Sequence, residues 1–496
     1  MNTQLRRVAW TAMGLIVALV VATTYWQTWA RPGLAARQDN EIQRVAEFEV
    51  RRGLILAPER RLARNETVRR RGKTLYFRKY PQGRLAAHVV GYSTASRARA
   101  GLEQSLNGVL TGTERDLAGL VESQLDELRG EPIVGDTVVT TLDIRAQQVA
   151  LEALGRKCGS VVALDPRSGK VRVLASSPSY DPNLVERKFG LIDRIRADCR
   201  PAAPLLNRAS QGLYPPGSIF KVVTAAAALE SNRWAPDSGF VDPGYCIAYG
   251  KRVNNFDTSR PFGRVNLATA LQFSVNSVFC NIGKELGARR ILEQARKFGF
   301  YDRPPLETPE SERFPSGLYR TTARGRDLWF PEQDFQVDAG RMAFGQERML
   351  VTPLQMAMVA AGVANGGIVM RPSVLDRFVS PRGTTVDRVE REQLRRAVRP
   401  GNARDIRAMM VRAVEAGTGT AARISGYRVG GKTGTAETGV AARNTTWFIA
   451  FAGRRGQRPE LAIAVVLEGQ SSTGGQTAAP IARTVMEALL RPAANP

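Results

Sequence analysis

Two side chains that could do chemistry together stand three residues apart near the middle of the chain. Ser218 offers a hydroxyl and Lys221 an amine, and both follow the stiff Pro-Pro-Gly turn at residues 215–217. Residues 222–229 are apolar and favour a helix, so Ser218 is predicted to lie at a helix start. Residues three apart share one helical face, and a helix N-terminus stabilises an anion formed beside it. The pattern predicts a serine nucleophile with a lysine base.

The ordinary alternative is a serine that caps a helix and a lysine in solvent. Two further stretches argue against it. Ser274 and Asn276 form a Ser-x-Asn between the apolar residues 267–273 and a second helical pattern. Residues 431–436, Gly-Lys-Thr-Gly-Thr-Ala, precede a strand-like stretch. Chance rarely produces Ser-x-x-Lys, Ser-x-Asn and Lys-Thr-Gly in this order and at such wide separations.

Composition limits the class of protein without naming it. With 496 residues, of which 43% are hydrophobic, the chain can hold a large core and two domains beyond any membrane anchor. The formal net charge of +25 indicates an anionic neighbourhood such as lipid headgroups, wall polymers or nucleic acid. Charge alone does not choose among these.

Histidine and cysteine are scarce. The one histidine, His88, is far in sequence from the three motifs, and no Gly-x-Ser-x-Gly elbow occurs, so Lys221 is the better base. We expect no metal and no cofactor, because Cys/His zinc spacings are absent. Four cysteines could form two disulfides in three connectivities, and buried free thiols are equally compatible. These cysteines are Cys158, Cys199, Cys246 and Cys280.

The N-terminal region reads as a membrane anchor. Arg6 and Arg7 precede an apolar run at residues 8–25, and Trp26 and Trp29 follow it. We predict a cytoplasmic tail at residues 1–7 and a transmembrane anchor at residues 8–29. A cleaved signal peptide is the alternative, but no Ala-x-Ala site follows promptly.

Residues 30–135 are predicted to form a smaller, membrane-proximal pedestal domain that ends near the turn at 130–132. Short helices are expected at about 39–50, 101–112 and 117–128. Basic residues crowd between 51 and 79, and a solvated face is the default interpretation, with binding to anionic lipid or wall polymer as the alternative. These basic residues include Arg60, Arg61, Arg64, Arg69, Arg70, Arg71, Lys73 and Arg78.

Residues 136–496 are predicted to form the second domain, of α+β class. Strands are expected at 138–143, 160–164, 171–175, 447–451 and 461–467, and helices at 144–154, 353–364 and 478–490. Strands at both ends of this segment with helices between them imply one antiparallel sheet built from distant segments, with a helical subdomain inserted. Residues 303–336 are expected to be a loop that flanks the active site.

The three motifs together resemble those of penicillin-binding proteins and serine β-lactamases. Further stretches at 140–143, 177–183, 345–346, 352–355 and 364–367 resemble a class B penicillin-binding protein, a membrane-anchored peptidoglycan D,D-transpeptidase, over residues 138–490. The length and the Asn107 region look most like the PbpA-type branch of actinobacteria. Residues 56–58 depart from the family, because Asp-Arg-Asn is usual there, and this departure leaves the pedestal's partner contacts open.

The resemblance implies a mechanism. Lys221, neutral through burial and the neighbouring Lys432, would take the proton of Ser218 as Ser218 attacks the D-Ala-D-Ala carbonyl of a stem peptide. The backbone amides of Ser218 and Thr435 would hold the oxyanion. Ser274 would relay a proton to the leaving D-alanine, and an amine from a neighbouring stem would complete the cross-link.

Substrate binding is implied for five residues. Asn276 would hydrogen-bond the peptide backbone. The Lys-Thr-Gly stretch would receive the terminal carboxylate through Lys432, Thr433 and Thr435, with Gly434 between them. The family also implies covalent binding of β-lactams, a single-pass cell-membrane protein with a cytoplasmic N-terminus and an extracytoplasmic catalytic domain, and a membrane glycan polymerase of the shape or division type as partner. No nucleic-acid partner is expected.

Three rival hypotheses remain at this level. Residues 426–433 satisfy the P-loop pattern, but a P-loop needs a buried strand before it and a helix after it. A β-lactam sensor or a non-catalytic scaffold would keep the fold, although the intact motif residues argue against this. In a β-lactamase or D,D-carboxypeptidase, water would resolve the acyl-enzyme, and no acidic residue can be assigned from the sequence to activate that water.

Overall fold

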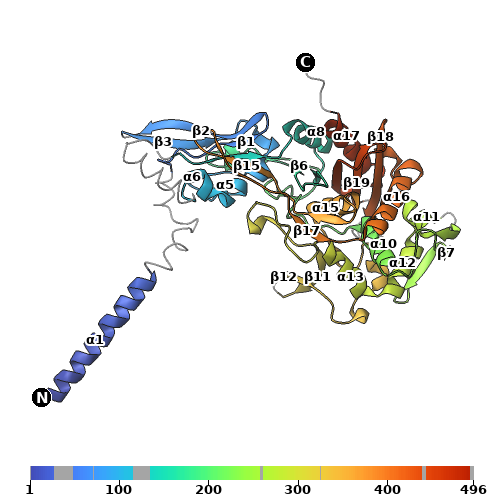
Figure 1. Ribbon diagram of the computed structural model, residues 1–496, viewed down its shortest axis with the longest axis horizontal. Coiled ribbons are helices and arrows are strands. Elements are labelled where there is room, and N and C mark those ends of the chain that lie inside the picture. The colour runs from blue at the N-terminus through green and yellow to red at the C-terminus, as the bar shows by residue number, and fades with distance from the viewer. Residues whose placement is uncertain are drawn as a thin grey trace.

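The computed structural model describes residues 2–26, 48–70, 72–114, 134–256, 258, 261–323, 325–437 and 443–491. Helix α1 (Asn2–Tyr25) stands apart from the folded body (Figure 1). Its segment Arg6–Tyr25 has a mean hydropathy of 1.8, so this helix is long and apolar enough to cross a membrane. Trp29, the predicted helix at 117–128, most of the predicted helix at about 39–50 and the turn at 130–132 lie outside the described residues.

A six-stranded sheet joins the two predicted domains. Its order is β16-β15-β4-β1-β2-β3, in which β4 pairs in parallel with β1 and antiparallel with β15. Its strands are β1 (Ile55–Ala57), β2 (Arg60–Arg70), β3 (Lys73–Lys79), β4 (Thr137–Thr140), β15 (Leu375–Val379) and β16 (Thr385–Arg388). The predicted boundary at 135/136 therefore falls just before β4, and β4 hydrogen-bonds both to β1 of the first predicted domain and to β15 of the second. The two domain limits stay predictions.

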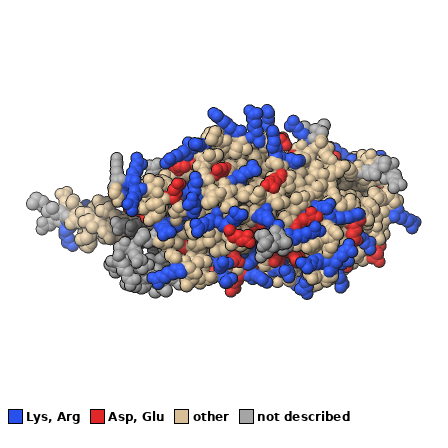
Figure 2. Space-filling model, turned by 90° about the horizontal axis from the view of Figure 1, so that it is seen from above, with Lys and Arg blue, Asp and Glu red and all other residues tan. Residues whose placement is uncertain are grey.

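Two arginines of the basic segment lie inside this region. Arg52 and Arg78 are buried, and both form ion pairs with the fully buried Glu103, at 3.0 and 2.6 Å. The inclusion of Arg78 in a solvated face was therefore wrong, because a buried carboxylate on α5 compensates its charge. Most of the other basic residues of the segment are exposed, and Figure 2 shows Lys and Arg side chains spread over one face of the protein.

The second sheet is antiparallel, five-stranded and buried on both faces, with the order β18-β19-β20-β5-β6. Its strands are β5 (Gly159–Leu164), β6 (Val171–Ser177), β18 (Tyr427–Ala436), β19 (Asn444–Arg454) and β20 (Leu461–Gln470). The predicted pairing of strands from both ends of the segment is confirmed. Alternate residues of the central strands feed two apolar cores, so helices must cover both faces.

Helices α8 (Ile144–Leu154) and α17 (Ala478–Leu490) cover one face of this sheet, and α15 (Pro353–Ala364) covers the other. Every residue of α15 is buried, and the side chain of Thr352 caps its first turn, as the sequence predicts. The remaining helices of the helical subdomain gather around α10 (Lys221–Glu230) (Figure 1). They are α11 (Leu267–Gln272), α12 (Asn276–Leu286), α13 (Ala288–Lys297), α14 (Ala339–Met342) and α16 (Pro400–Ala416).

The segment 303–336 is not the predicted loop. It contains β11 (Gly317–Thr322) and β12 (Gly325–Trp329), which form a hairpin and pair with β13 (Met349–Leu350). Buried Leu318 anchors this hairpin, although many Pro, Gly and charged residues around it hide the strand pattern. Three two-stranded pairs complete the sheets: β7 (Gly239–Asp242) with β10 (Gly263–Asn266), β8 (Tyr245–Ala248) with β9 (Lys251–Asn254), and β14 (Ile368–Met370) with β17 (Gln393–Arg396).

Short helices close the pedestal and the loops. The α-helical ones are α4 (Ala87–Val90), α5 (Gly101–Ser105), α6 (Asn107–Thr111) and α9 (Phe189–Asp193). The 3-10 helices are η2 (Gly83–Leu85), η3 (Pro182–Leu184), η4 (Gly217–Phe220), η5 (Glu310–Glu312), η6 (Asp334–Gln336) and η7 (Thr420–Ala422). Helices α5 and α6 confirm the helical prediction at 101–112.

All four cysteines are paired. Cys158 bonds to Cys199, and Cys246 bonds to Cys280. This is one of the three connectivities that the sequence allows, and the free-thiol alternative was wrong. The second disulfide ties β8 to α12, the helix that begins at Asn276.

Candidate active site

The turn that carries Ser218 is held from behind. Trp447 Nε1 donates a hydrogen bond to the carbonyl of Pro215 (3.0 Å), and the amide of Gly217 donates to the carbonyl of Gly345 (3.0 Å). Gly217 has φ +53° and Gly345 φ +81°, and a Cβ on Gly345 would lie 2.0 Å from the Gly217 carbonyl oxygen. Ser218 itself is partly exposed, whereas Gly217 and Ile219 on either side are buried. The fold thus presents one hydroxyl at the surface of a packed turn.

Lys221 is the first residue of α10 and is completely buried. Its Nζ lies 2.7 Å from the Ser274 carbonyl, 2.6 Å from Asn276 Oδ1 and 3.2 Å from Ser274 Oγ. A neutral amine has two N–H donors, which match the two shorter contacts, and its lone pair can then accept a proton. The first and second sequence motifs therefore meet at this amine.

Ser274 connects the second motif to the third. It sits between α11 and α12 with φ +61°, a conformation that is uncommon for residues other than glycine. This backbone geometry directs both its carbonyl and its hydroxyl to Lys221. Lys432 Nζ donates to Ser274 Oγ at 2.9 Å, so an unbroken chain of hydrogen bonds runs from Lys432 through Ser274 to Lys221.

The two lysines have shifted acid–base properties. Burial lowers the pKa of Lys221 well below its ordinary value, and the positive charge of Lys432 lowers it further. Burial also lowers the pKa of Lys432 to about 7. Because the charged form is penalised in both cases, at least one of the amines can be neutral near neutral pH and act as a base.

Strand β18 brings the Lys-Thr-Gly stretch against the serine turn. A Cβ on Gly434 would lie 3.0 Å from the Pro216 carbonyl oxygen, and a Cβ on Gly217 would lie 3.0 Å from the Thr435 carbonyl oxygen. The glycines therefore permit a close approach of the two backbones. Thr435 is partly exposed like Ser218, and the two residues lie on the backbone segments that approach each other here.

Two groups that support the site were missed by the sequence analysis. Thr418 Oγ1 lies 2.7 Å from Thr433 Oγ1, and the Asn276 amide donates to the Asn254 carbonyl at 2.9 Å. Both partners are distant in sequence from the residues they contact. Thr418 lies in a Gly-Thr-Gly-Thr stretch that matches no recognised motif. Asn254 belongs to the β8–β9 hairpin, whose sequence likewise gives no indication that it supports the site.

The structure brings all eight predicted site residues together. One expected contact, the hydrogen bond between Ser218 and Lys221, is not formed. The Ser218 hydroxyl makes no hydrogen bond to Lys221 or to any other group in the described part of the chain. Unliganded acid–base sites often have such loose contacts. His88 lies elsewhere, on α4, where its Nε2 is 2.8 Å from the Pro204 carbonyl oxygen. A Ser-His arrangement is therefore excluded.

Neither a metal site nor a P-loop is supported. Within the described residues, one group of three potential ligands lies close together, Cys158, Cys199 and Glu468. The two sulfurs are joined in a disulfide, and Glu468 accepts hydrogen bonds from Arg208 and Tyr214. The P-loop-like residues 427–433 lie within strand β18 and not in a loop before a helix, so they cannot wrap around phosphates.

Comparison with protein families agrees with this geometry. Residues 159–487 match the penicillin-binding protein transpeptidase domain, and residues 52–138 match the penicillin-binding protein A dimerisation domain. The first match alone covers more than half of the chain.

Known relatives cover the chain almost completely. The peptidoglycan D,D-transpeptidase PbpA of Mycolicibacterium smegmatis is 36% identical, with 99% of each chain covered. The peptidoglycan D,D-transpeptidase MrdA of Acinetobacter baumannii is 30% identical over 84% of this chain and 66% of that protein.

Solved structures give the same result. Penicillin-binding protein A from M. tuberculosis, as a ceftriaxone acyl-enzyme complex, superposes with a TM-score of 0.79 at 33% identity, over 90% of this chain and all of the other. Its penicillin G acyl-enzyme complex has a TM-score of 0.77 at 32% identity, over 89% of this chain and all of the other. With its three motifs assembled in one cleft, this chain belongs to the class B penicillin-binding proteins of the PbpA type.

Proposed function

We propose that this protein is a serine D,D-transpeptidase that cross-links peptidoglycan stem peptides through an acyl-enzyme and is acylated by β-lactams. The observation that carries the proposal is the buried hydrogen-bond chain Lys432–Ser274–Lys221 one helical turn from Ser218. Relatives with full coverage are named peptidoglycan D,D-transpeptidases, and structures with similar folds hold β-lactams as acyl-enzymes. No cofactor has a part in this mechanism.

In the acylation step, Ser218 Oγ attacks the carbonyl between the two D-alanines of a donor stem. The neutral Lys221 amine accepts the Ser218 proton, because burial and Lys432 lower its pKa. The backbone amides of Ser218 and Thr435 stabilise the oxyanion of the tetrahedral intermediate. The packing of Gly217 and Gly434 against each other's segment supports this assignment, since it brings the two amide-bearing backbones together.

Departure of D-alanine requires a proton on its nitrogen. Ser274 Oγ, which contacts both lysine amines, is placed to pass that proton from Lys221 to the leaving group. An amine from a second stem peptide then attacks the ester carbonyl, and the same relay removes the amine's proton. The new amide is the cross-link, and Ser218 regains its hydroxyl.

Substrate recognition uses the other edge of the cleft. Lys432, Thr433 and Thr435 bind the terminal carboxylate of the donor stem or of a β-lactam, and Gly434 keeps the strand close to the serine turn. Asn276 holds the peptide backbone. Its Oδ1 accepts from Lys221 while its amide donates to Asn254, so its orientation is set from both ends.

Helix α1 suits a single-pass anchor in the cell membrane, with residues 1–7 in the cytoplasm and the catalytic domain outside. On this arrangement residues 30–135 form the pedestal and 136–496 the transpeptidase domain. A membrane glycan polymerase of the shape or division type would supply the strands to be cross-linked. Replacing residues 8–25 with a cleavable secretion signal should release a soluble protein that still reacts with penicillin.

The function is tested with purified protein and two assays. Fluorescent penicillin should label Ser218, and the label should persist, because a transpeptidase resolves its acyl-enzyme with an amine and not with water. Mass spectrometry of a reaction with synthetic stem peptides should detect a dimeric cross-linked product. Release of D-alanine without dimer would identify a D,D-carboxypeptidase, and rapid loss of the penicillin label would identify a β-lactamase.

A further inference from the structure

A cavity of about 440 Å³ opens beside α16, away from the three motifs. Val411 of α16 and Phe451 of β19, both almost fully buried, give it an apolar floor, and Pro459 adds an edge. The floor exists because β18 carries Gly430 opposite Phe451, where a Cβ would lie 2.3 Å from the aromatic ring. This size and lining are those of a ligand-binding cleft.

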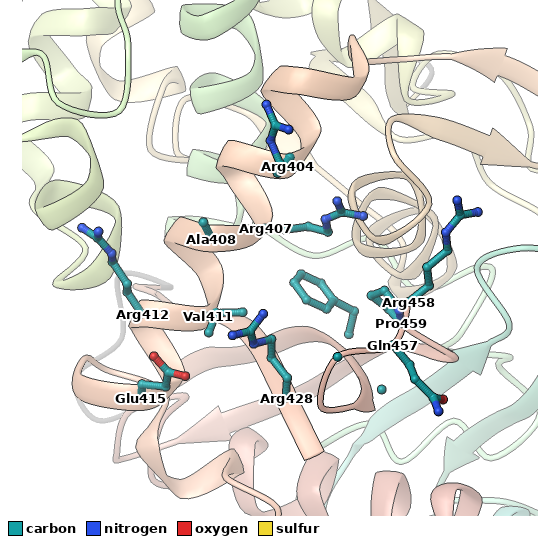
Figure 3. Close-up of a pocket in the computed structure, with 13 residues that line it drawn as sticks. Arg404, Arg407, Ala408, Val411, Arg412, Glu415, Arg428, Gln457, Arg458 and Pro459 are labelled. Atoms are coloured by element: carbon teal, nitrogen blue, oxygen red, sulfur yellow. The ribbon is translucent and has the colours of Figure 1, made fainter. Parts of the chain in front are cut away.

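Arginines dominate the rim. Arg404 and Arg407 come from α16, Arg428 from β18, and Arg458 from the turn after β19. Figure 3 shows Arg407 extending from α16 toward the segment that carries Arg458, Arg458 rising along the far side of the cavity with its guanidinium turned outward, and Arg428 rising toward α16, whereas Arg412 points away. Arginines from three different elements therefore line one cavity.

Ion pairs with described residues do not neutralise these arginines. In the part of the chain that the structure describes, none of Arg404, Arg407, Arg428 or Arg458 forms an ion pair, and the one hydrogen bond among them runs from Arg407 to the Ala364 carbonyl. Burial lowers the pKa of Arg407, and the charges of Arg404 and Arg458 lower it further. Positive groups held this close repel one another, and an anion among them would relieve the repulsion.

The basic surface continues past this cavity. A second, more open hollow shares Gln457 and Arg458 with the first and adds Arg167 and Arg454. The one acidic residue at the rim of the first cavity, Glu415, forms no ion pair with described residues, and the second hollow contains Glu460. An elongated site of this kind fits an extended ligand with several negative charges better than a single small anion.

The site is separate from the catalytic cleft and from the membrane end of the molecule. Arg428 precedes Lys432 by four residues on the same strand, which corresponds to roughly 13 Å. In Figure 1, α16 and β18 lie toward the opposite end of the folded body from β2 and β3 of the pedestal, and Phe48, the first described residue after α1 and Trp26, hydrogen-bonds to β3. A lipid headgroup is therefore a poor match for the cavity, and a soluble ligand is a better one.

We propose that this arginine-rimmed cavity is a docking site for an acidic peptide segment of a partner protein. One apolar side chain of the segment covers Val411 and Phe451, and flanking carboxylates pair with Arg407, Arg428 and Arg458. Guanidinium groups bind carboxylates in pairs of parallel hydrogen bonds, and an apolar anchor surrounded by charged contacts is typical of peptide-binding sites. The apolar floor favours a peptide over a phosphate polymer, which has no apolar group to place there.

The test uses the full-length protein in detergent micelles and a fluorescein-labelled peptide, Asp-Glu-Leu-Glu-Asp. Fluorescence anisotropy should give saturable binding that weakens at least tenfold when salt rises from about 50 to about 300 mM. Replacing the central Leu with Gly should weaken binding severalfold, and replacing the four acids with their amides should abolish it. The double variant Arg428→Glu/Arg458→Glu should lose binding at least tenfold.

The control is Arg320→Glu, a charge change at an exposed position of β11, and its match is each single variant, Arg428→Glu or Arg458→Glu, measured beside the double variant. Arg320→Glu should bind the peptide like the natural protein, and all variants should react with fluorescent penicillin at unchanged rates, which shows that they are folded. Absence of saturable peptide binding, or an equal loss in Arg320→Glu, would overturn the proposal. The proposal would also be overturned if the protein bound phosphatidylglycerol vesicles through Arg428 and Arg458 and did not bind the peptide. Because acylation is measured on the same samples, failure here is distinguishable from failure of the proposed enzyme function.

Discussion

Lys432 Nζ and Ser274 Oγ, contributed by residues 158 positions apart, lie 2.9 Å from each other at the centre of the site. Ser274 Oγ is also 3.2 Å from the Lys221 amine. One hydroxyl therefore couples two buried lysines whose pKa values are both lowered. Whichever amine loses its proton first makes protonation of the other easier, so the pair should titrate as a unit.

Ser218→Ala should abolish covalent labelling by fluorescent penicillin. The change removes a partly exposed hydroxyl from a turn that Trp447 and Gly345 hold in place, so the fold should persist. Labelling followed by gel analysis measures the first effect, and circular dichroism the second. Stoichiometric labelling of the variant would show that another residue is the nucleophile.

Lys432→Ala should slow acylation more than Asn276→Ala does. A charge-assisted contact contributes on the order of 1.5–3 kcal/mol and a neutral one about 0.5–1.5, so the two rate losses should differ roughly tenfold. The comparison uses stopped-flow acylation by a carboxylate-bearing β-lactam. Equal losses would remove Lys432 from its assigned role as the carboxylate anchor.

The rate of acylation should depend on pH through Lys432. Its pKa is about 7 in the folded protein, so the amine is cationic below that pH and neutral above it. Attraction for the carboxylate of a β-lactam should therefore decline as pH rises through about 7, and Lys432→Ala should lack this decline. A profile that is the same in the natural protein and in Lys432→Ala would contradict the assignment.

Ser274→Gly and Ser274→Ala should differ in stability but not in chemistry. Both lack the relay hydroxyl and should acylate slowly. Because position 274 has φ +61°, alanine is strained there and glycine is not, so the glycine variant should be more stable by about 1 kcal/mol. Thermal unfolding measures the difference. Equal melting temperatures would mean that the backbone relaxes when the side chain is removed.

Glu103→Gln should destabilise the protein by about 3–5 kcal/mol, because it removes the buried carboxylate with which Arg52 and Arg78 form ion pairs. Glu49→Gln, which breaks the exposed pair with Lys73, is the control and should cost under about 1 kcal/mol. Urea unfolding at neutral pH compares the two variants. Similar losses in both would show that the buried cluster contributes no more than a surface pair.

The same carboxylate gives a pH dependence of stability. Burial raises the pKa of Glu103, but Arg78 and Arg52 outweigh it and hold the pKa below its ordinary value. The stabilisation is therefore complete above the unfolded pKa near 4.5 and is lost as pH falls through the folded pKa. In Glu103→Gln the free energy of unfolding should fall less between neutral and acid pH than it does in the natural protein.

Removing the Cys246–Cys280 disulfide with paired serine substitutions should lower both stability and the acylation rate. The bond closes a loop of 34 residues, worth about 3–4 kcal/mol, and it fixes the β8–β9 hairpin that holds Asn276 through Asn254. The matched control removes Cys158–Cys199, with a separation of 41, and should cost similar stability without slowing acylation. Equal slowing in both variants would argue against a positioning role.

Local sequence patterns identify the reactive groups and most of the helices and strands. Helix caps, turn residues and alternating apolar patterns act over a few residues, so the hairpin at 160–175, the helix at 353–364 and the start of a helix near Ser218 could be predicted locally. The family motifs named the eight site residues for the same reason, since each motif is a short local pattern.

Contacts between distant residues could not be predicted from such local patterns. The hairpin at 317–329, the burial of Arg78 on Glu103 and the choice of disulfide partners all depend on contacts between segments far apart in the chain. The left-handed conformation of Ser274 and the lowered pKa values of the two lysines likewise arise from burial and from neighbours on other elements. Such contacts leave no periodic pattern in the sequence, because long-range packing and desolvation, not local preference, stabilise them.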